Sequence, residues 1–274
     1  MYICIETIYK TMKIGKTSKA LIICCLCIYN LQPAASQEWL FRAHSSEIFP
    51  ELPATGCFLS SFADMRLRDD FGMKEMMHAQ VNGNWVRGGN CLLTSLAHYG
   101  YTHYGDLQLA IGYGRNFGNR FSLCTRLFYS VQHARDYPAR HSISTDFAFA
   151  CRITPTLWVE TTVFNPFLMR YGLIGKEVIP LKFSISCGYL PSRKLLVALT
   201  MSKSLPGAWE INGRILTQAA QPLLLAADCS NHRIALTVSI VHKRFLFNIQ
   251  TAWHYRIALS PRIGMSVFPE NMKP

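Results

Sequence analysis

The feature that most constrains the fold is a long alternation of side chains in residues 121–151. Apolar and aromatic residues alternate with smaller or polar ones from 121 to 132, and the alternation resumes from 141 to 151. A period of two indicates a β-strand, and strands of soluble proteins are usually about five or six residues long. A tilted strand that crosses a bilayer needs about 9–11 residues. The two halves of this stretch therefore predict neighbouring membrane-spanning strands.

The composition suits a chain that has an apolar outer surface as well as a core. Hydrophobic residues make up 50% of the chain and charged residues only 16%, against about 25% charged in an average protein. No stretch approaches the about 18–20 consecutive apolar residues of a spanning helix, which disfavours a helical membrane protein. A soluble β-sandwich would need more charge on its outward faces. We therefore expect an all-β fold, a transmembrane antiparallel β-barrel.

From residue 88 onward the alternation predicts a ladder of about twelve strands with turn residues between them. The strands are expected at 90–100, 104–114, 120–132, 141–151, 156–164, 178–190, 195–203, 207–217, 222–229, 233–241, 245–256 and 259–268. Two connections are longer, 133–140 and 165–177, and an even number of strands separates them, so both lie on one side of the ladder. Bacterial barrels carry their longer loops outside, which places both ends of the ladder in the periplasm.

Residues 37–87 are less regular, and the sequence leaves their role open. Residues 54–62 and 77–86 have strand character, while the charged segment between them looks helical. This region could be an additional hairpin, which would make fourteen strands. It could also be a periplasmic plug or a segment packed in the lumen.

A targeting segment is expected at residues 1–36. Basic residues precede an apolar run at 20–31, and small residues then predict cleavage between Ser36 and Gln37. Met12 would open a more ordinary signal peptide than the first methionine does. The remaining assignment is the N-terminal segment 37–87, the barrel at 88–268 and a C-terminal tail at 269–274. The expected location is the cell outer membrane.

The ten cysteines do not have the pattern of a disulfide framework or a metal site. Four lie within the expected signal peptide, where no small-residue lipobox supports a lipoprotein anchor. The other six are far apart, without a C-x-x-C motif or a close histidine. We interpret them as small hydrophobic residues.

The net charge of +12 does not point to nucleic acid, because the chain has no basic run and no basic helix. We attribute the charge to turns and rims that lie beside outer-membrane lipid and lipopolysaccharide, the expected partners.

No motif for catalysis or for a cofactor is found in the sequence. The best cluster is His133, Asp136 and His141 around one loop, and such rim residues are usually solvated surface. The segment G-Y-G-R-N-F-G at 112–118 lacks the βαβ context of a nucleotide-binding loop, so its glycines are expected to relieve crowding. The chain is therefore expected not to be an enzyme, and no catalytic, cofactor-binding or metal residue is assigned.

Several charged residues fall in the inward phase of their strands. A charge facing lipid at the midplane costs about 2–4 kcal/mol, so these side chains are expected to line the lumen or its rims. The lumen-facing candidates are Asp106, Arg126, Asp146, Glu160, Lys182 and Arg214. Arg126 and Asp146 lie on neighbouring strands, and a plain salt bridge is the simplest interpretation. We expect a mostly plugged lumen of mixed polarity rather than an open pore.

As a whole, residues 88–268 resemble outer-membrane barrels of the long-chain fatty-acid transporter superfamily. The likeness lies in G-D-L-Q-L-A-I-G-Y-G at 105–114, R-F-S-L-C-T-R-L-F-Y at 120–129, V-F-N-P-F at 163–167, I-P-L-K-F-S-I-S-C-G-Y at 179–189 and the ending at 249–267. It is nearest to the branch associated with type IX secretion in Gram-negative bacteria (PorV/PorQ-like). Two departures are L-L-L-A-A-D-C at 223–229 and the absence of a clear counterpart of a lumen plug.

The resemblance implies one of two roles, transport of hydrophobic solutes or protein secretion. The corresponding partners are a hydrophobic small molecule or a secreted protein. A structural or adhesive surface barrel is the alternative, and the short loops disfavour it. An outer-membrane enzyme ranks lower still.

Overall fold

The computed structural model describes residues 52–70, 73, 76–101, 103–171, 178–255 and 259–269. The expected signal peptide, its cleavage site, the start at Met12 and nearly all of the expected tail lie outside the described residues. Within them, no helix is both long and apolar enough to cross a membrane.

Fourteen strands and one short helix make up the described part of the chain. The helix is α4 (Pro53–Gly56). The strands are β1 (Phe62–Asp69), β2 (Met77–Arg87), β3 (Asn90–Tyr101), β4 (Tyr104–Phe117), β5 (Phe121–Ala134), β6 (Tyr137–Thr154), β7 (Leu157–Phe164), β8 (Leu181–Ser192), β9 (Leu195–Leu205), β10 (Trp209–Ala220), β11 (Leu223–Ser230), β12 (Arg233–His242), β13 (Phe245–His254) and β14 (Leu259–Val267).

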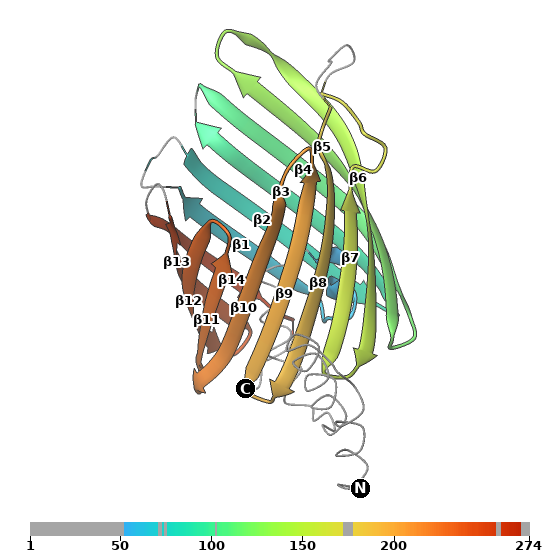
Figure 1. The fold of residues 1–274 in the computed structure, drawn as a ribbon, viewed down its shortest axis with the longest axis vertical. Coiled ribbons are helices and arrows are strands. Elements are labelled where there is room, and N and C mark those ends of the chain that lie inside the picture. Colours follow the sequence, from blue (N-terminus) through green and yellow to red (C-terminus); the bar gives the residue numbers. More distant parts are fainter. Residues whose placement is uncertain are drawn as a thin grey trace, which may run out of the picture. The chain divides into compact units, whose positions relative to one another are not determined.

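The strands form one closed antiparallel barrel in which each pairs with its neighbours in sequence (Figure 1). The first and last strands close the ring, with Ala63 opposite Val267 and Arg68 opposite Arg262. Closure gives every strand a neighbour on both sides, so most of the backbone polar groups of the wall are paired within the sheet. A barrel can therefore present apolar side chains outward over its whole circumference.

The prediction of about twelve strands is wrong, because the described residues form a barrel of fourteen. The two additional strands are β1 and β2, which lie in the irregular N-terminal segment. Residues 54–61 hold α4 and a turn rather than a strand, and β1 takes up Phe62 and the first part of the charged segment that looked helical. Its alternation was hidden because Asp64 and Arg66 point into a polar lumen and are buried there, while apolar Met65 points outward.

The predicted loop at 133–140 is also mostly strand. β5 extends to Ala134 and β6 begins at Tyr137, which leaves a two-residue turn between them. Pro138 does not interrupt this pairing because it lies at the end of the ladder, where a missing N–H is tolerated. The connection from Phe164 to Leu181 remains long, and its residues 172–177 lie outside the description.

The outer and inner faces of the wall differ sharply in polarity. Along β5, the outward Leu123, Leu127 and Tyr129 are exposed, while the inward Ser122 and Arg126 are buried. Other strands follow the same rule, with large apolar side chains exposed on the outside. These exposed apolar side chains form a continuous surface around the barrel. Soluble monomers rarely expose apolar patches much larger than a few hundred Å². The outer face therefore suits contact with lipid.

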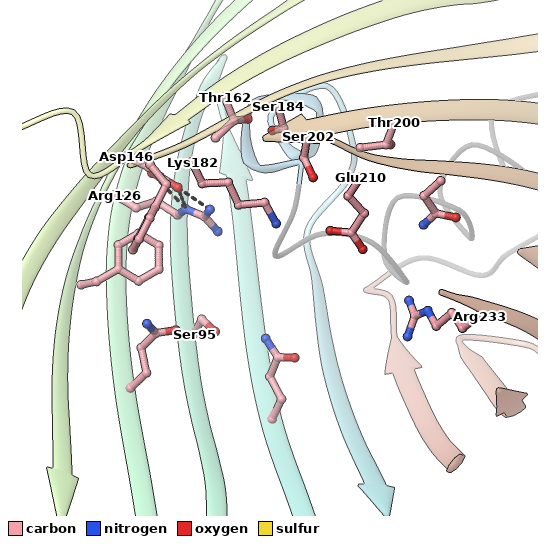
Figure 2. A pocket seen from close by; sticks show the side chains of 15 residues that line it. Ser95, Arg126, Asp146, Thr162, Lys182, Ser184, Thr200, Ser202, Glu210 and Arg233 are labelled. Carbon is pink, nitrogen blue, oxygen red and sulfur yellow. Dashed lines mark hydrogen bonds and ion pairs between the residues drawn. The ribbon is translucent and has the colours of Figure 1, made fainter. Parts of the chain in front are cut away.

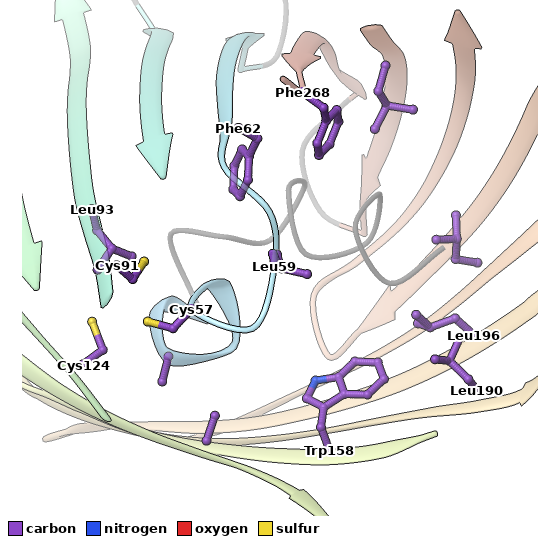
Figure 3. Close-up of a cluster of buried hydrophobic side chains, with 14 of the residues drawn as sticks. Cys57, Leu59, Phe62, Cys91, Leu93, Cys124, Trp158, Leu190, Leu196 and Phe268 are labelled. Carbon is purple, nitrogen blue, oxygen red and sulfur yellow. The ribbon is translucent and has the colours of Figure 1, made fainter. Parts of the chain in front are cut away.

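The lumen is filled with apolar side chains at the end where β1 begins and β14 ends. Figure 3 shows Leu59, Phe62, Trp158 and Phe268 gathered there with other buried residues from around the wall. Helix α4 and the turn after it lie among them. We call this packed layer the floor of the barrel.

Candidate functional site

The lumen contains a cavity of about 310 Å³ that polar and aromatic side chains surround (Figure 2). Its lining comes from ten strands of the wall. The lining residues are Gln80, Ser95, Gln108, Arg126, Phe128, Asp146, Thr162, Phe164, Lys182, Ser184, Thr200, Ser202, Glu210, Asn212 and Arg233. Cavities that bind small organic ligands begin at about this size.

A buried ion pair between Arg126 and Asp146 forms part of the wall of this cavity. The two residues lie directly opposite on β5 and β6. Arg126 donates from Nη2 at 2.5 Å and from Nε at 3.0 Å to Oδ2 of Asp146. The guanidinium also lies 5.0 Å from the ring centroid of Phe128. A forked contact of this kind fixes the arginine in one orientation.

A glycine on the next strand makes room for this arginine. A Cβ placed on Gly112 of β4 would collide with the Cγ atom of Arg126. Gly188 on β8 has the same relation to the indole ring of Trp158 in the floor. These inward glycines therefore leave space for large inward side chains on neighbouring strands.

The other predicted lumen residues are spread over several places. Lys182 lines the cavity from β8, and Asp106 on β4 accepts a hydrogen bond from Gln132 Nε2 at 3.1 Å. Arg214 on β10 lies buried opposite Asp228, 3.5 Å from its carboxylate. Only Arg126, Asp146 and Lys182 share the cavity.

Glu160 on β7 does not line the cavity but holds the floor in place. Its carboxylate accepts hydrogen bonds from the backbone N–H of Ala54 at 3.0 Å and of Thr55 at 2.7 Å. Only 1% of Glu160 is exposed, so these bonds replace its lost hydration. The first N–H groups of a helix lack partners within it, and an acid there satisfies them.

Further contacts attach α4 and its turn to other strands. Asn84 of β2 donates to the Gly56 carbonyl at 3.0 Å, and Asn116 of β4 donates to the Cys57 carbonyl at 2.6 Å. The ring of Phe58 lies 4.9 Å from the guanidinium carbon of Arg152 on β6. The floor segment is thus tied to the wall from β2, β4, β6 and β7.

Sequence reasoning missed a polar network on β1, β2 and β14. Asp64 pairs with Arg66 at 2.7 Å and accepts hydrogen bonds from Asn82 at 2.9 Å and Ser266 at 3.1 Å. Asp64 and Arg66 occupy alternate, inward positions of β1. The period of two in this segment was therefore the signal in the sequence that could have revealed the network.

Three thiols, those of Cys57, Cys91 and Cys124, converge in the floor (Figure 3). All six cysteines of the described region are free. The described residues contain no group of three or more histidine, cysteine or acidic side chains arranged to hold a metal ion. The two histidines of the predicted rim cluster have separate partners. His141 bonds to the Tyr129 hydroxyl at 2.8 Å, and the ring of His133 covers Gly105.

A second hollow of about 490 Å³ lies on the outer surface of β4–β7. Most of its lining residues point outward, including Tyr113, Phe117, Leu123 and Phe149. Because it belongs to the apolar exterior, it suits lipid rather than a lumen solute.

No protein-family profile and no curated protein matches the chain. Among solved structures, the Ralstonia pickettii toluene transporter TbuX is similar with a TM-score of 0.62 at 6% identity, over 81% of this chain and 93% of that one. The CymD monoaromatic hydrocarbon channel is similar with a TM-score of 0.63 at 7% identity, over 83% and 94%. The TodX deltaS2S3 mutant monoaromatic hydrocarbon channel gives 0.62 at 8% identity, over 80% and 92%.

Identities this low establish likeness of fold alone. The class that fold and site define is a closed β-barrel of the kind found in channels and transporters, with a filled floor and a polar cavity.

Proposed function

We propose that the chain is a plugged β-barrel of the bacterial outer membrane that transports small solutes with a hydrophobic part, and that it is not an enzyme. The observation that carries this proposal is the floor, which fills the lumen where β1 begins and β14 ends. A cavity of about 310 Å³ gives a solute a place to bind. A floor held by hydrogen bonds favours a gated passage over a permanently open pore.

The apolar exterior and the closed ladder support insertion in a membrane, since lipid offers no partners for free backbone groups. The hydrophobic character of the solute is supported by the similar solved structures, whose names specify toluene or monoaromatic hydrocarbons. Phe128 and Phe164 offer apolar surface inside the cavity, with ring centroids 5.3 Å apart.

Uptake of labelled toluene by cells that produce the barrel tests the proposal. Thr200→Trp should fill the cavity from β9 and lower the barrel-dependent uptake to background. Leu199→Trp on the same strand is the matched control, because Leu199 points outward and is 47% exposed. In planar bilayers the intact barrel should show no large stable conductance. Equal uptake by both variants, or a large conductance, would contradict the proposal.

A role in protein secretion, including type IX secretion, is the second candidate, and one observation favours it. Asn165 of the V-F-N-P-F segment fixes the long connection after β7, donating to the Ile179 carbonyl at 2.7 Å and accepting from the Met169 N–H at 2.9 Å. An anchored loop suits docking of a partner protein. Co-purification of a secreted protein that Asn165→Ala abolishes, with toluene uptake unchanged, would support this role.

A further inference from the structure

The three thiols that converge in the floor belong to different elements. Cys57 follows α4 in the floor segment, while Cys91 lies on β3 and Cys124 on β5. All three are free cysteines, and their exposed fractions are only 0%, 1% and 5%. Figure 3 shows Cys57 reaching toward the wall between Cys91 and Cys124. Reactive groups of the floor segment and of the wall therefore meet at this place.

The register of the wall puts a glycine between the two wall cysteines. Cys91 lies directly opposite Gly114 of β4, and Gly114 lies directly opposite Cys124. A Cβ atom on Gly114 would collide with the Sγ atom of Cys57 and would lie 3.4 Å from the Cβ atom of Cys124. The thiol of Cys57 therefore fills the space that the missing side chain leaves beside Cys124.

Distances decide which of these thiols can be joined. A whole strand separates Cys91 from Cys124, so their Cα atoms are about 10 Å apart. A disulfide needs Cα atoms within about 7 Å of each other, which excludes a bond between these two. Cys91 is also engaged, because its thiol donates to Oδ1 of Asn84 at 2.7 Å. Cys124 is therefore the better partner for Cys57.

We propose that Cys57 and Cys124 form a disulfide site that fastens the floor segment to β5 covalently when the chain is oxidised. Each thiol gives up a proton, and a bond forms between the two sulfur atoms. Their two electrons reduce the disulfide of an external oxidant to two thiols, which take up the protons. Because both thiols are buried in the folded barrel, this exchange takes place before the floor has finished packing.

The bacterial periplasm is oxidising enough to supply such an oxidant. The inference rests on the proposed outer-membrane location, which brings the chain through the periplasm, and not on the transport of a solute. Hydrogen bonds hold the floor segment from β2, β4 and β7, and each of them can open separately. A covalent bond to β5 would keep Cys57 at the wall even when they open.

Refolding of the purified barrel from urea into detergent, in a mixture of oxidised and reduced glutathione, tests the inference. Mass spectrometry of peptides released without reduction should find the bond between Cys57 and Cys124 in most folded molecules. A chain that keeps only these two cysteines should form the same bond and migrate faster in a denaturing gel without reductant. A chain that keeps only Cys91 and Cys124 is the matched control and should form about tenfold less of a cross-linked product.

Three results would overturn the inference. They are a folded barrel whose thiols all stay reduced in the glutathione mixture, a main bond from Cys57 to any cysteine other than Cys124, and equal cross-linking in the two-cysteine chains. The peptide measurement uses the unaltered chain, so it remains decisive if a two-cysteine chain does not fold. Because the reaction requires neither a membrane nor a solute, its failure is distinct from failure of toluene uptake.

Discussion

At the scale of single residues, the lumen is organised by charges that have to find partners in a small space. Arg126 and Asp146 do so across one strand pair, and Asp64 and Arg66 within one strand. Glu160 instead finds backbone N–H groups more than a hundred residues away in sequence, at Ala54 and Thr55. Each arrangement replaces the hydration that a buried charge loses.

The ion pair of Arg126 and Asp146 predicts a characteristic result in a mutant cycle. Asp146→Asn leaves the buried arginine without its counter-charge and should destabilise the barrel by about 3–5 kcal/mol. Replacing both residues by apolar ones, Arg126→Met with Asp146→Leu, should recover most of that loss because no unpaired charge remains. Urea unfolding in detergent measures the free energies. A double variant less stable than Asp146→Asn would contradict this account.

Whether the contacts of these residues could be predicted from the sequence depended on how far apart the partners lie along the chain. The alternation placed Arg126 and Asp146 in the inward phase of adjacent strands. Their direct pairing depends on the two-residue turn between β5 and β6, where the sequence predicted a longer loop. The alternation also placed Glu160 inward. The partners of Glu160 could not be predicted, because α4 has four residues. A helix of that length is too short to show a period of 3.6.

At the scale of elements, α4 and the following turn act as a separable insert in the lumen. Four strands contribute the groups that hold the insert, and one of these groups, the carboxyl group of Glu160, is almost completely enclosed. Loss of this acid should therefore loosen the insert without opening the wall.

Glu160→Gln is predicted to expose the floor. A neutral amide has one acceptor oxygen in place of two and adds a donor that faces the helix N–H groups, so it holds α4 less firmly. In a chain whose only remaining cysteine is Cys57, maleimide labelling of the folded barrel should become about tenfold faster. Glu210→Gln is the matched control, because Glu210 lines the cavity away from α4. Equal labelling rates in the two variants would show that Glu160 does not fix the insert.

The short strand β7 is another element that the alternation located but did not explain. Its eight residues pair with only the last part of β6, from Asp146 to Thr154. Among the described residues, the earlier part of β6 thus has a full strand partner only in β5. The connection after β7 lies beside this edge, where the N–H of Asn165 donates to the carbonyl of Thr145 at 2.7 Å.

At the scale of the whole molecule, strand number was the main error of sequence reasoning. The predicted ladder from residue 88 onward matches β3–β14 to within a few residues. Alternation identifies each strand from its own side chains, but closure depends on how many strands a barrel needs. The number of strands needed for closure is a property of the whole barrel and is not visible in any single strand. The two strands that were missed, β1 and β2, carry polar side chains toward the lumen. In the sequence, such residues resemble those of a solvent-exposed segment.

The role of β1 and β2 in closure gives a prediction for the whole barrel. Without residues 62–87, β3 and β14 would become free edges, and lipid cannot satisfy their backbone groups. The deletion should therefore abolish the folded form that migrates differently from the heated one in gel electrophoresis. A short tag inserted at Arg193, in the exposed turn between β8 and β9, is the matched control because it leaves every ladder intact. A shortened chain that kept heat-modifiable migration would mean that β3–β14 close by themselves, and the hairpin would then be an accessory rather than part of the barrel's minimal wall.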